Sequence, residues 1–209
     1  LKAGANGEPG HSLRIFSAKF VKDEENLLIT GGWDKTIKIW DVRSGDVVRN
    51  ICGPFVCGDS IDMHDGYILQ DHTLNPVATT LEFSTGKFCE EIAFQTPAEK
   101  QAGNPACQVY TTQFLKTTGD LIVAGGAVAN EAKIFDGGNY FQPAATITDL
   151  SRAVYSSDFN NAGDMLALGG GDGVVRCFNI VGDMIEYKIK NSKNLNLNWS
   201  GFWGFGVLG

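Results

Sequence analysis

Short runs in which apolar and polar residues alternate recur along the chain, and turn-forming residues separate them. The clearest pair lies within residues 27–43, where the apolar run 27–29 leads into Gly31 and Gly32 and the alternating run 37–40 follows. Strict alternation is the pattern of a strand with one buried face, and a short polar turn between two such runs predicts a β-hairpin. We therefore expect an antiparallel strand pair here.

This hairpin belongs to a unit that occurs four times. Strands are predicted in the first unit at 14–21, 27–32, 37–41 and 47–52, and in the second at 57–63, 67–70, 79–83 and 88–94. In the third unit they are predicted at 109–115, 121–126 and 132–136, and in the fourth at 153–159, 165–173, 174–179 and 184–190. An aromatic or apolar residue followed by an acid or amide marks each unit, at Trp40-Asp41, Leu81-Glu82, Phe135-Asp136 and Phe178-Asn179. Such repetition at roughly forty residues indicates a repeat fold in which each unit packs on its neighbours.

The boundaries of the units follow from these runs. We place the repeats within residues 10–190, as units at about 10–52, 53–94, 108–147 and 150–190, after a linker at 1–9. Residues 95–107 carry two prolines and little periodicity, which predicts an extended loop. The tail 191–209 holds Trp199, Phe202, Trp203 and Phe205; it reads either as an incomplete strand or as an aromatic anchor for a partner.

Four side chains of the first unit, together with Gly10 and Asp41, make the chain resemble WD40-repeat β-propeller proteins. In that family a His, a Thr or Ser, an Asp and a Trp of one blade form a hydrogen-bonded tetrad, and the matching residues here are His11, Thr30, Asp34 and Trp40. The chemistry is consistent, because buried imidazole and indole N–H groups need acceptors. The alternative for His11 and Asp34 is a catalytic dyad.

The resemblance implies an all-β fold, a WD40-type β-propeller with about four four-stranded antiparallel blades. Propellers of this family usually have seven blades, so we expect part of a larger propeller whose missing blades, or a partner chain, close the ring. The later blades are degenerate. Leu81 and Pro54 leave the second without a tetrad, so we expect it to rest on packing alone, Ala124 replaces the hydroxyl of the third, and Asp172 of the fourth has lost its His and hydroxyl partners.

Composition and net charge limit the kinds of partner and the cellular compartment that we expect. With 26 glycines, 6 prolines and a net charge of −7 over 209 residues, the chain fits one all-β domain and disfavours nucleic acid, which requires clustered cations. A basic protein face is the easier partner electrostatically. Five scattered cysteines do not form a disulfide framework, so we expect a reducing, cytoplasmic location, and no apolar run is long enough to predict a membrane span.

No pattern in the chain predicts an enzyme, a metal site or a cofactor site. The candidate metal ligands lack ligand spacing: Cys52, Cys57, His64, His72 and Cys89. The glycine-rich run 169–173 lies between two strands, so we interpret it as a hairpin turn and not as a phosphate loop. The alternative is a small-ligand or enzymatic propeller that uses its central channel, where the inner strands offer hydroxyls at Ser17, Thr111, Thr112, Ser156 and Ser157.

The resemblance instead implies a scaffold that binds a protein or peptide on the face formed by the loops into the innermost strands. Alignment places the following residues there, and they are our predicted partner-binding set: Arg14, Phe16, Trp33, Asp59, Tyr110 and Tyr155. Aromatic residues and arginine form most interface hot spots, although rings in strands are also ordinary packing residues. A second alternative is the WDxR box of cullin-RING ubiquitin ligase substrate receptors, which residues 40–43 resemble and in which Arg43 would dock the adaptor.

Overall fold

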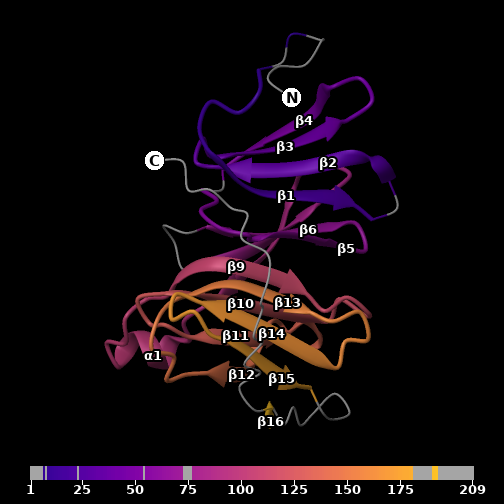
Figure 1. Cartoon of the computed structure of the whole chain (residues 1–209). Coiled ribbons are helices and arrows are strands. Elements are labelled where there is room, and N and C mark those ends of the chain that lie inside the picture. Colours follow the sequence, from indigo (N-terminus) through magenta and orange to yellow (C-terminus); the bar gives the residue numbers. More distant parts are fainter. Residues whose placement is uncertain are drawn as a thin grey trace.

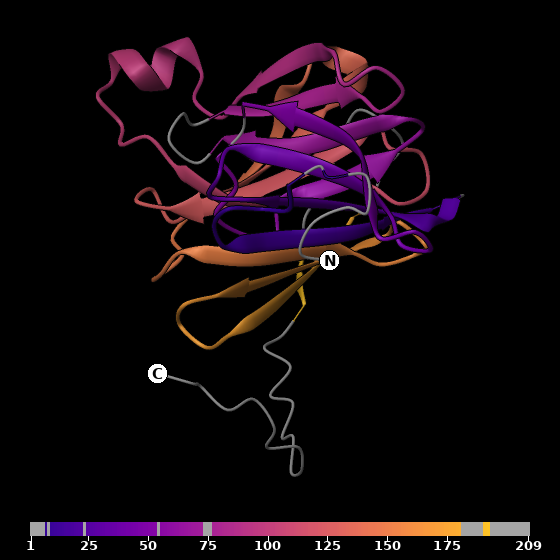
Figure 2. The same cartoon turned by 90° about the horizontal axis from the view of Figure 1, so that it is seen from above.

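The computed structural model describes residues 7, 9–22, 24–53, 55–72, 77–180 and 190–192. Within these ranges the chain forms four antiparallel sheets of four strands, and each sheet is built from strands that follow one another along the sequence. The sheets lie as successive blades around a common axis (Figures 1 and 2). The prediction of an all-β propeller with four four-stranded blades is confirmed.

The blades share one order of strands, innermost first. The first contains β1 (Ile15–Val21), β2 (Glu24–Gly32), β3 (Thr36–Asp41) and β4 (Asp46–Cys52). The second contains β5 (Ile61–His64), β6 (Tyr67–His72), β7 (Val77–Glu82) and β8 (Phe88–Ala93). The third contains β9 (Gln108–Phe114), β10 (Leu121–Ala127), β11 (Ala132–Asp136) and β12 (Gln142–Ile147). The fourth contains β13 (Val154–Phe159), β14 (Met165–Gly170), β15 (Val175–Asn179) and β16 (Lys190–Ser192).

The core lies between the blades, because each strand points alternate side chains toward its two neighbours. Ile29, Ile37 and Ile39 of the first blade pack on Ile68 and Leu81 of the second. Equivalent clusters join the second blade to the third and the third to the fourth. The outward face of the fourth blade is different: Met165 is 36% exposed and Val175 is 51% exposed.

The segment between the second and third blades differs from the predicted extended loop. A short helix, α1 (Pro97–Gln101), stands out from the blades at the lower left of Figure 1. Thr96 caps this helix, and the Glu99 carboxylate accepts a hydrogen bond from the backbone N–H of Thr96 at 2.7 Å, which forms a capping box. Proline at the first helical position adds to the helix start. Pro97, one of the two prolines that suggested a loop, is therefore part of a helix, and Pro105 lies after its end.

Several strand boundaries also differ from the sequence prediction. β5 begins at Ile61, because residues 57–60 form a turn closed by a hydrogen bond from Ser60 N–H to Gly58 O at 2.9 Å. The outer strand of the fourth blade was expected at 184–190, and all of that range except Lys190 lies outside the described residues. The described outer strand is β16. The aromatic residues of the tail also lie outside the described ranges.

Candidate functional site

The predicted tetrad of the first blade is formed. The indole N–H of Trp40 donates to Thr30 Oγ1 at 2.8 Å, Thr30 Oγ1 lies 2.7 Å from His11 Nε2, and His11 Nδ1 lies 2.9 Å from Asp34 Oδ2. When the imidazole hydrogen is on Nδ1, every hydrogen-bond donor of the tetrad meets one acceptor. Trp40 is only 1% exposed, so the unit is buried and structural, and it fixes the turn that presents Trp33.

Asp34 is the acceptor at the end of this chain. Burial opposes its charge, but hydrogen bonds from Thr36, from the Ser12 backbone and from His11 outweigh that effect and lower the pKa of Asp34. In the fourth blade Asp172 has new partners in place of the lost tetrad: Arg176 at 2.6 Å and Ser151 at 3.0 Å. The side-chain bond from Arg176 lowers the pKa of Asp172.

The sequence predicted that the second blade rests on packing alone. The structure differs, because buried hydrogen bonds also hold this blade. Gln70 occupies the position of the tetrad hydroxyl and donates to Thr79 Oγ1 at 2.7 Å, and the hydroxyl of Ser60 donates to the buried carboxylate of Asp71. Asp62 accepts from the backbone N–H of Phe114 in the third blade at 2.8 Å. Buried polar bonds therefore replace the tetrad here.

Three of the predicted partner-binding residues share one backbone feature. Phe16, Tyr110 and Tyr155 each stand in a register shift of the innermost strand, without a partner in the ladder to the second strand. These are β-bulges, which turn a side chain out of the regular pleat. A glycine faces each bulge and permits a close approach of backbones: an added Cβ at Gly126 would lie 1.8 Å from the carbonyl oxygen of Gln108.

The bulged aromatic residues gather into two groups. Trp33 lies between Phe16 and Phe55, with ring centroids 5.0 Å and 6.1 Å away, and the guanidinium of Arg14 lies 5.3 Å above its ring. Tyr110 and Tyr155 meet edge to face at 5.4 Å. Tyr155 is 52% exposed. The structure thus brings five of the predicted residues into two aromatic groups at the ends of the innermost strands.

Asp59 takes a different position from the other predicted residues. It faces the axis of the propeller, where Ser17 Oγ donates to Asp59 Oδ1 at 3.3 Å. Three more of the hydroxyls proposed for a channel site are used in the same way, since Thr111 and Ser157 bond at 2.8 Å and Thr112 donates to Ser60 O at 2.8 Å. Ser156 is exposed. The hydrogen bonds of the other hydroxyls join the innermost strands of neighbouring blades.

Arg43 lies in the β3–β4 turn, at the opposite end of the strands from Trp33. Its guanidinium donates to Asp41 Oδ2 at 2.8 Å and to Asp41 Oδ1 at 3.2 Å. Hydrogen bonds from the Arg43 side chain lower the pKa of Asp41 to about 2. The Arg43 side chain is still 69% exposed, so the arginine is both held within the turn and open to solvent.

Phe55 and Cys57 lie beside Trp33, and no sequence pattern singled out Phe55. Phe55 comes from the loop after β4, and Cys57 Sγ accepts from the Trp33 indole N–H at 3.1 Å. All five cysteines are free, and burial raises the pKa of the Cys107 thiol to about 12. Within the described ranges no group of three or more His, Cys, Asp or Glu side chains could hold a metal ion, and no helix could cross a membrane.

The comparisons with known proteins match this geometry. The model of the family described as WD domain, G-beta repeat, matches residues 7–41, the span that contains the whole tetrad. The chain contains a WD40 repeat at this span, and it resembles WD40-repeat β-propeller proteins. The β-propeller domain of Myceliophteria thermophila Cps50 (Swd1) superposes with a TM-score of 0.69 at 14% identity, over 87% of this chain and 59% of that one. The WD40 propeller domain of Doa1 superposes with a TM-score of 0.62 at 21% identity, over 81% and 52%.

Two curated relatives match most of this chain at low sequence identity. The ribosome biogenesis protein WDR12 homolog of Aedes aegypti is 27% identical over 81% of this chain and 37% of its own length. The WD repeat-containing protein AAC3 of Dictyostelium discoideum is 24% identical over 82% of this chain and 34% of its own length. This WD40 chain therefore spans about a third of the length of these relatives.

Proposed function

We propose that the chain is a non-enzymatic interaction platform that binds a protein or peptide partner on the face that carries Trp33, Phe16, Tyr110 and Tyr155. The observation that carries this proposal is the position of three aromatic residues at equivalent β-bulges. Bulges direct side chains out of the sheet, and aromatic residues beside arginine are the typical hot spots of protein interfaces. The net charge of −7 favours a partner with a basic surface.

Two other functions have less support. Adaptor docking in a ubiquitin ligase would require Arg43, whose guanidinium is already engaged by Asp41 at 2.8 Å. A catalytic channel would require a free nucleophile beside a base, whereas the inner hydroxyls of Thr111, Thr112 and Ser157 serve contacts between blades. A platform function agrees with the way in which these groups are used. The free cysteines support work in a reducing compartment such as the cytoplasm.

The test is affinity capture with the intact chain, followed by binding measurements on the captured partner. We expect Trp33→Ala and Tyr155→Ala each to weaken binding by about 1 to 3 kcal/mol, which is typical of hot-spot truncation. Arg43→Ala should leave binding unchanged, because Arg43 lies roughly 15 Å away across a strand of about five residues at 3.3 Å each.

Tyr140→Ala is the matched control. Tyr140 is 88% exposed and lies in the β11–β12 turn on the face opposite Tyr155. Its substitution therefore removes the same aromatic ring from the face that is not proposed to bind the partner. The free energy of unfolding of Trp33→Ala must be measured in parallel, because Trp33 is half-buried. A partner that is lost with Arg43→Ala and retained by Tyr155→Ala and Trp33→Ala would reject the proposed face in favour of adaptor docking.

A further inference from the structure

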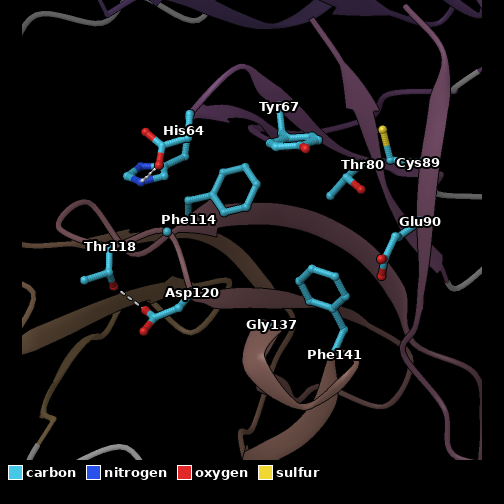
Figure 3. A pocket seen from close by; sticks show the side chains of 12 residues that line it. His64, Tyr67, Thr80, Cys89, Glu90, Phe114, Thr118, Asp120, Gly137 and Phe141 are labelled. Carbon is cyan, nitrogen blue, oxygen red and sulfur yellow. Dashed lines mark hydrogen bonds and ion pairs between the residues drawn. The ribbon is translucent and has the colours of Figure 1, made fainter.

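A cavity of about 420 Å³ opens between the second and third blades, on the face opposite Trp33. It lies among the β5–β6, β9–β10 and β11–β12 turns and is closed on one side by the outer strand β8 (Figure 3). The side chains that matter for its chemistry are His64, Tyr67, Glu90, Phe114, Asp120 and Phe141. A volume of this size is within the range of ligand sites and holds one long side chain with its backbone.

The walls of this cavity are aromatic. Figure 3 shows the rings of Tyr67, Phe114 and Phe141 around the open space. Phe114 is buried and fixed, and the His64 ring lies against it with centroids 5.9 Å apart. Gly119, which has a positive φ, backs the other side of His64, because an added Cβ there would lie 2.0 Å from His64 Cδ2. Two of the rings at the mouth are therefore held in place before any ligand arrives.

The cavity is lined by acidic side chains. Asp65, Glu90 and Asp120 line it, and no lysine or arginine does so within the described ranges. Asp65 lies 3.6 Å from His64 Nε2, and Asp120 accepts a hydrogen bond from Thr118. Glu90 makes no hydrogen bond or ion pair with any residue in the described part of the chain. In Figure 3 the carboxylates of Glu90 and Asp120 lie on opposite sides of the space between the rings.

We propose that this cavity binds the side chain of an arginine from a partner protein. A guanidinium is planar, stacks on aromatic faces and donates to carboxylates in a fork, so it matches walls of rings with acids on two sides. An ammonium lacks the planar face, and a divalent cation lacks a ligand set, since the described residues form no metal cluster. The site lies on the face opposite the bulged aromatic residues and does not depend on the proposed function.

The probe is the blocked tripeptide acetyl-Gly-Arg-Gly-amide, titrated into the full chain and followed by two-dimensional amide NMR. The citrulline tripeptide is its matched control, because citrulline keeps the shape of arginine and removes the charge. We expect saturable shifts of the amides at residues 64–66 and 118–120 with the arginine peptide, and weaker binding of the lysine and citrulline peptides. Trp33→Ala should leave these shifts unchanged.

Variants then test the two parts of the site. Glu90→Gln should weaken the arginine peptide by about two- to fivefold, the upper range for an exposed ion pair. Phe141→Leu should weaken it by about two- to fivefold, as expected for loss of a cation–π contact. Glu91→Gln is the control for charge, because Glu91 follows Glu90 in β8 and points to the other face of the strand. The amide spectrum of each variant reports its folding.

The outcomes that overturn the proposal are specific. Equal binding of the arginine and citrulline peptides would remove the role of charge, and equal binding of lysine would remove the role of the planar group. Equal effects of Glu90→Gln and Glu91→Gln would reduce the attraction to net charge alone. Shifts that map to another surface, or no saturable shift, would also overturn it.

Discussion

In the tetrad of the first blade, each of the four polar side chains has at least one hydrogen-bond partner. Asp34 accepts from His11, from Thr36 and from the backbone N–H of Ser12 at 3.0 Å. Its removal would leave the buried imidazole N–H with only the longer contact to Thr36 Oγ1 at 3.3 Å, and a poorly satisfied buried donor costs more than the bond itself contributes. The effect on stability should therefore come from the groups that remain.

We expect Asp34→Ala to lower the free energy of unfolding by about 1 to 3 kcal/mol. Chemical denaturation measures this loss. The comparison is Asp172→Ala, which should cost less because the partners of Asp172, Ser151 and Arg176, lie nearer to solvent. Equal losses for the two variants, or faster hydrogen exchange in the first blade than in the fourth, would contradict the view that the tetrad makes the first blade the most stable.

The burial of Lys133 differs from what the alternating sequence pattern predicts. In the run Ala132, Lys133, Ile134 it looks like the solvent-facing member of an alternating strand, yet its side chain is fully buried. Its ammonium donates to Phe94 O at 2.9 Å and to Glu99 Oε1 at 2.7 Å. The sequence could not indicate this, because Glu99 belongs to a helix in the segment taken for a loop.

Helix α1 and the third blade are therefore joined by an ion pair between the buried Lys133 and the half-buried Glu99. Burial opposes the charge of Glu99, but the bond from Lys133 and those at the cap outweigh it and lower the pKa of Glu99. Burial raises the pKa of the nearby Glu131, whose carboxylate lies 3.8 Å from the ammonium. Glu99 is thus the principal counter-ion, and the attachment of α1 depends on it.

Glu99→Gln should lower the free energy of unfolding by about 1 to 3 kcal/mol, the usual cost of a lost bond to a charged group. It should also increase hydrogen exchange across residues 95–104. Chemical denaturation and exchange read by mass spectrometry measure the two effects. Lys100→Gln is the control, since Lys100 lies in the same helix and is exposed. An unchanged exchange rate in Glu99→Gln would mean that α1 is held by other contacts.

At the scale of the element, the sequence predicted the strands well and the connections poorly. Apolar and alternating runs located the cores of β2, β3, β10 and β11, because these strands bury side chains between the blades. The helix was missed although Thr96 and Glu99 have the spacing of a capping box, since two prolines and the short length favoured a loop. The bulges and the cavity were missed because both depend on the register between strands.

At the scale of the whole molecule, the outward face of the fourth blade leaves apolar side chains uncovered. The outward face of the fourth blade exposes Val175 and Met165, with Ala167 and Cys177 half-buried beside them. In the other blades the equivalent faces pack on a neighbour. An apolar sheet face open to water favours association with another surface.

We expect the 209-residue chain to self-associate as its concentration rises, and Val175→Lys to shift it toward the monomer. Light scattering coupled to size exclusion measures this. Tyr140→Lys introduces the same charge at an exposed turn far from β15 and should leave the association unchanged. A monomer at every concentration, unfolding in one cooperative transition, would show that the four blades and the rest of the chain cover this face themselves.

The bulges beneath Phe16, Tyr110 and Tyr155 have a consequence for how this surface could change during evolution. A bulged residue has no partner in the ladder, so its replacement leaves the pairing of its strand intact. Selection could therefore exchange one ring per blade, and with it the preferred partner, at little risk to folding. The glycines opposite the bulges, such as Gly126, lack this freedom, because any larger residue would collide with the backbone. Within one pair of strands, the bulged position therefore tolerates substitution and the glycine opposite it does not.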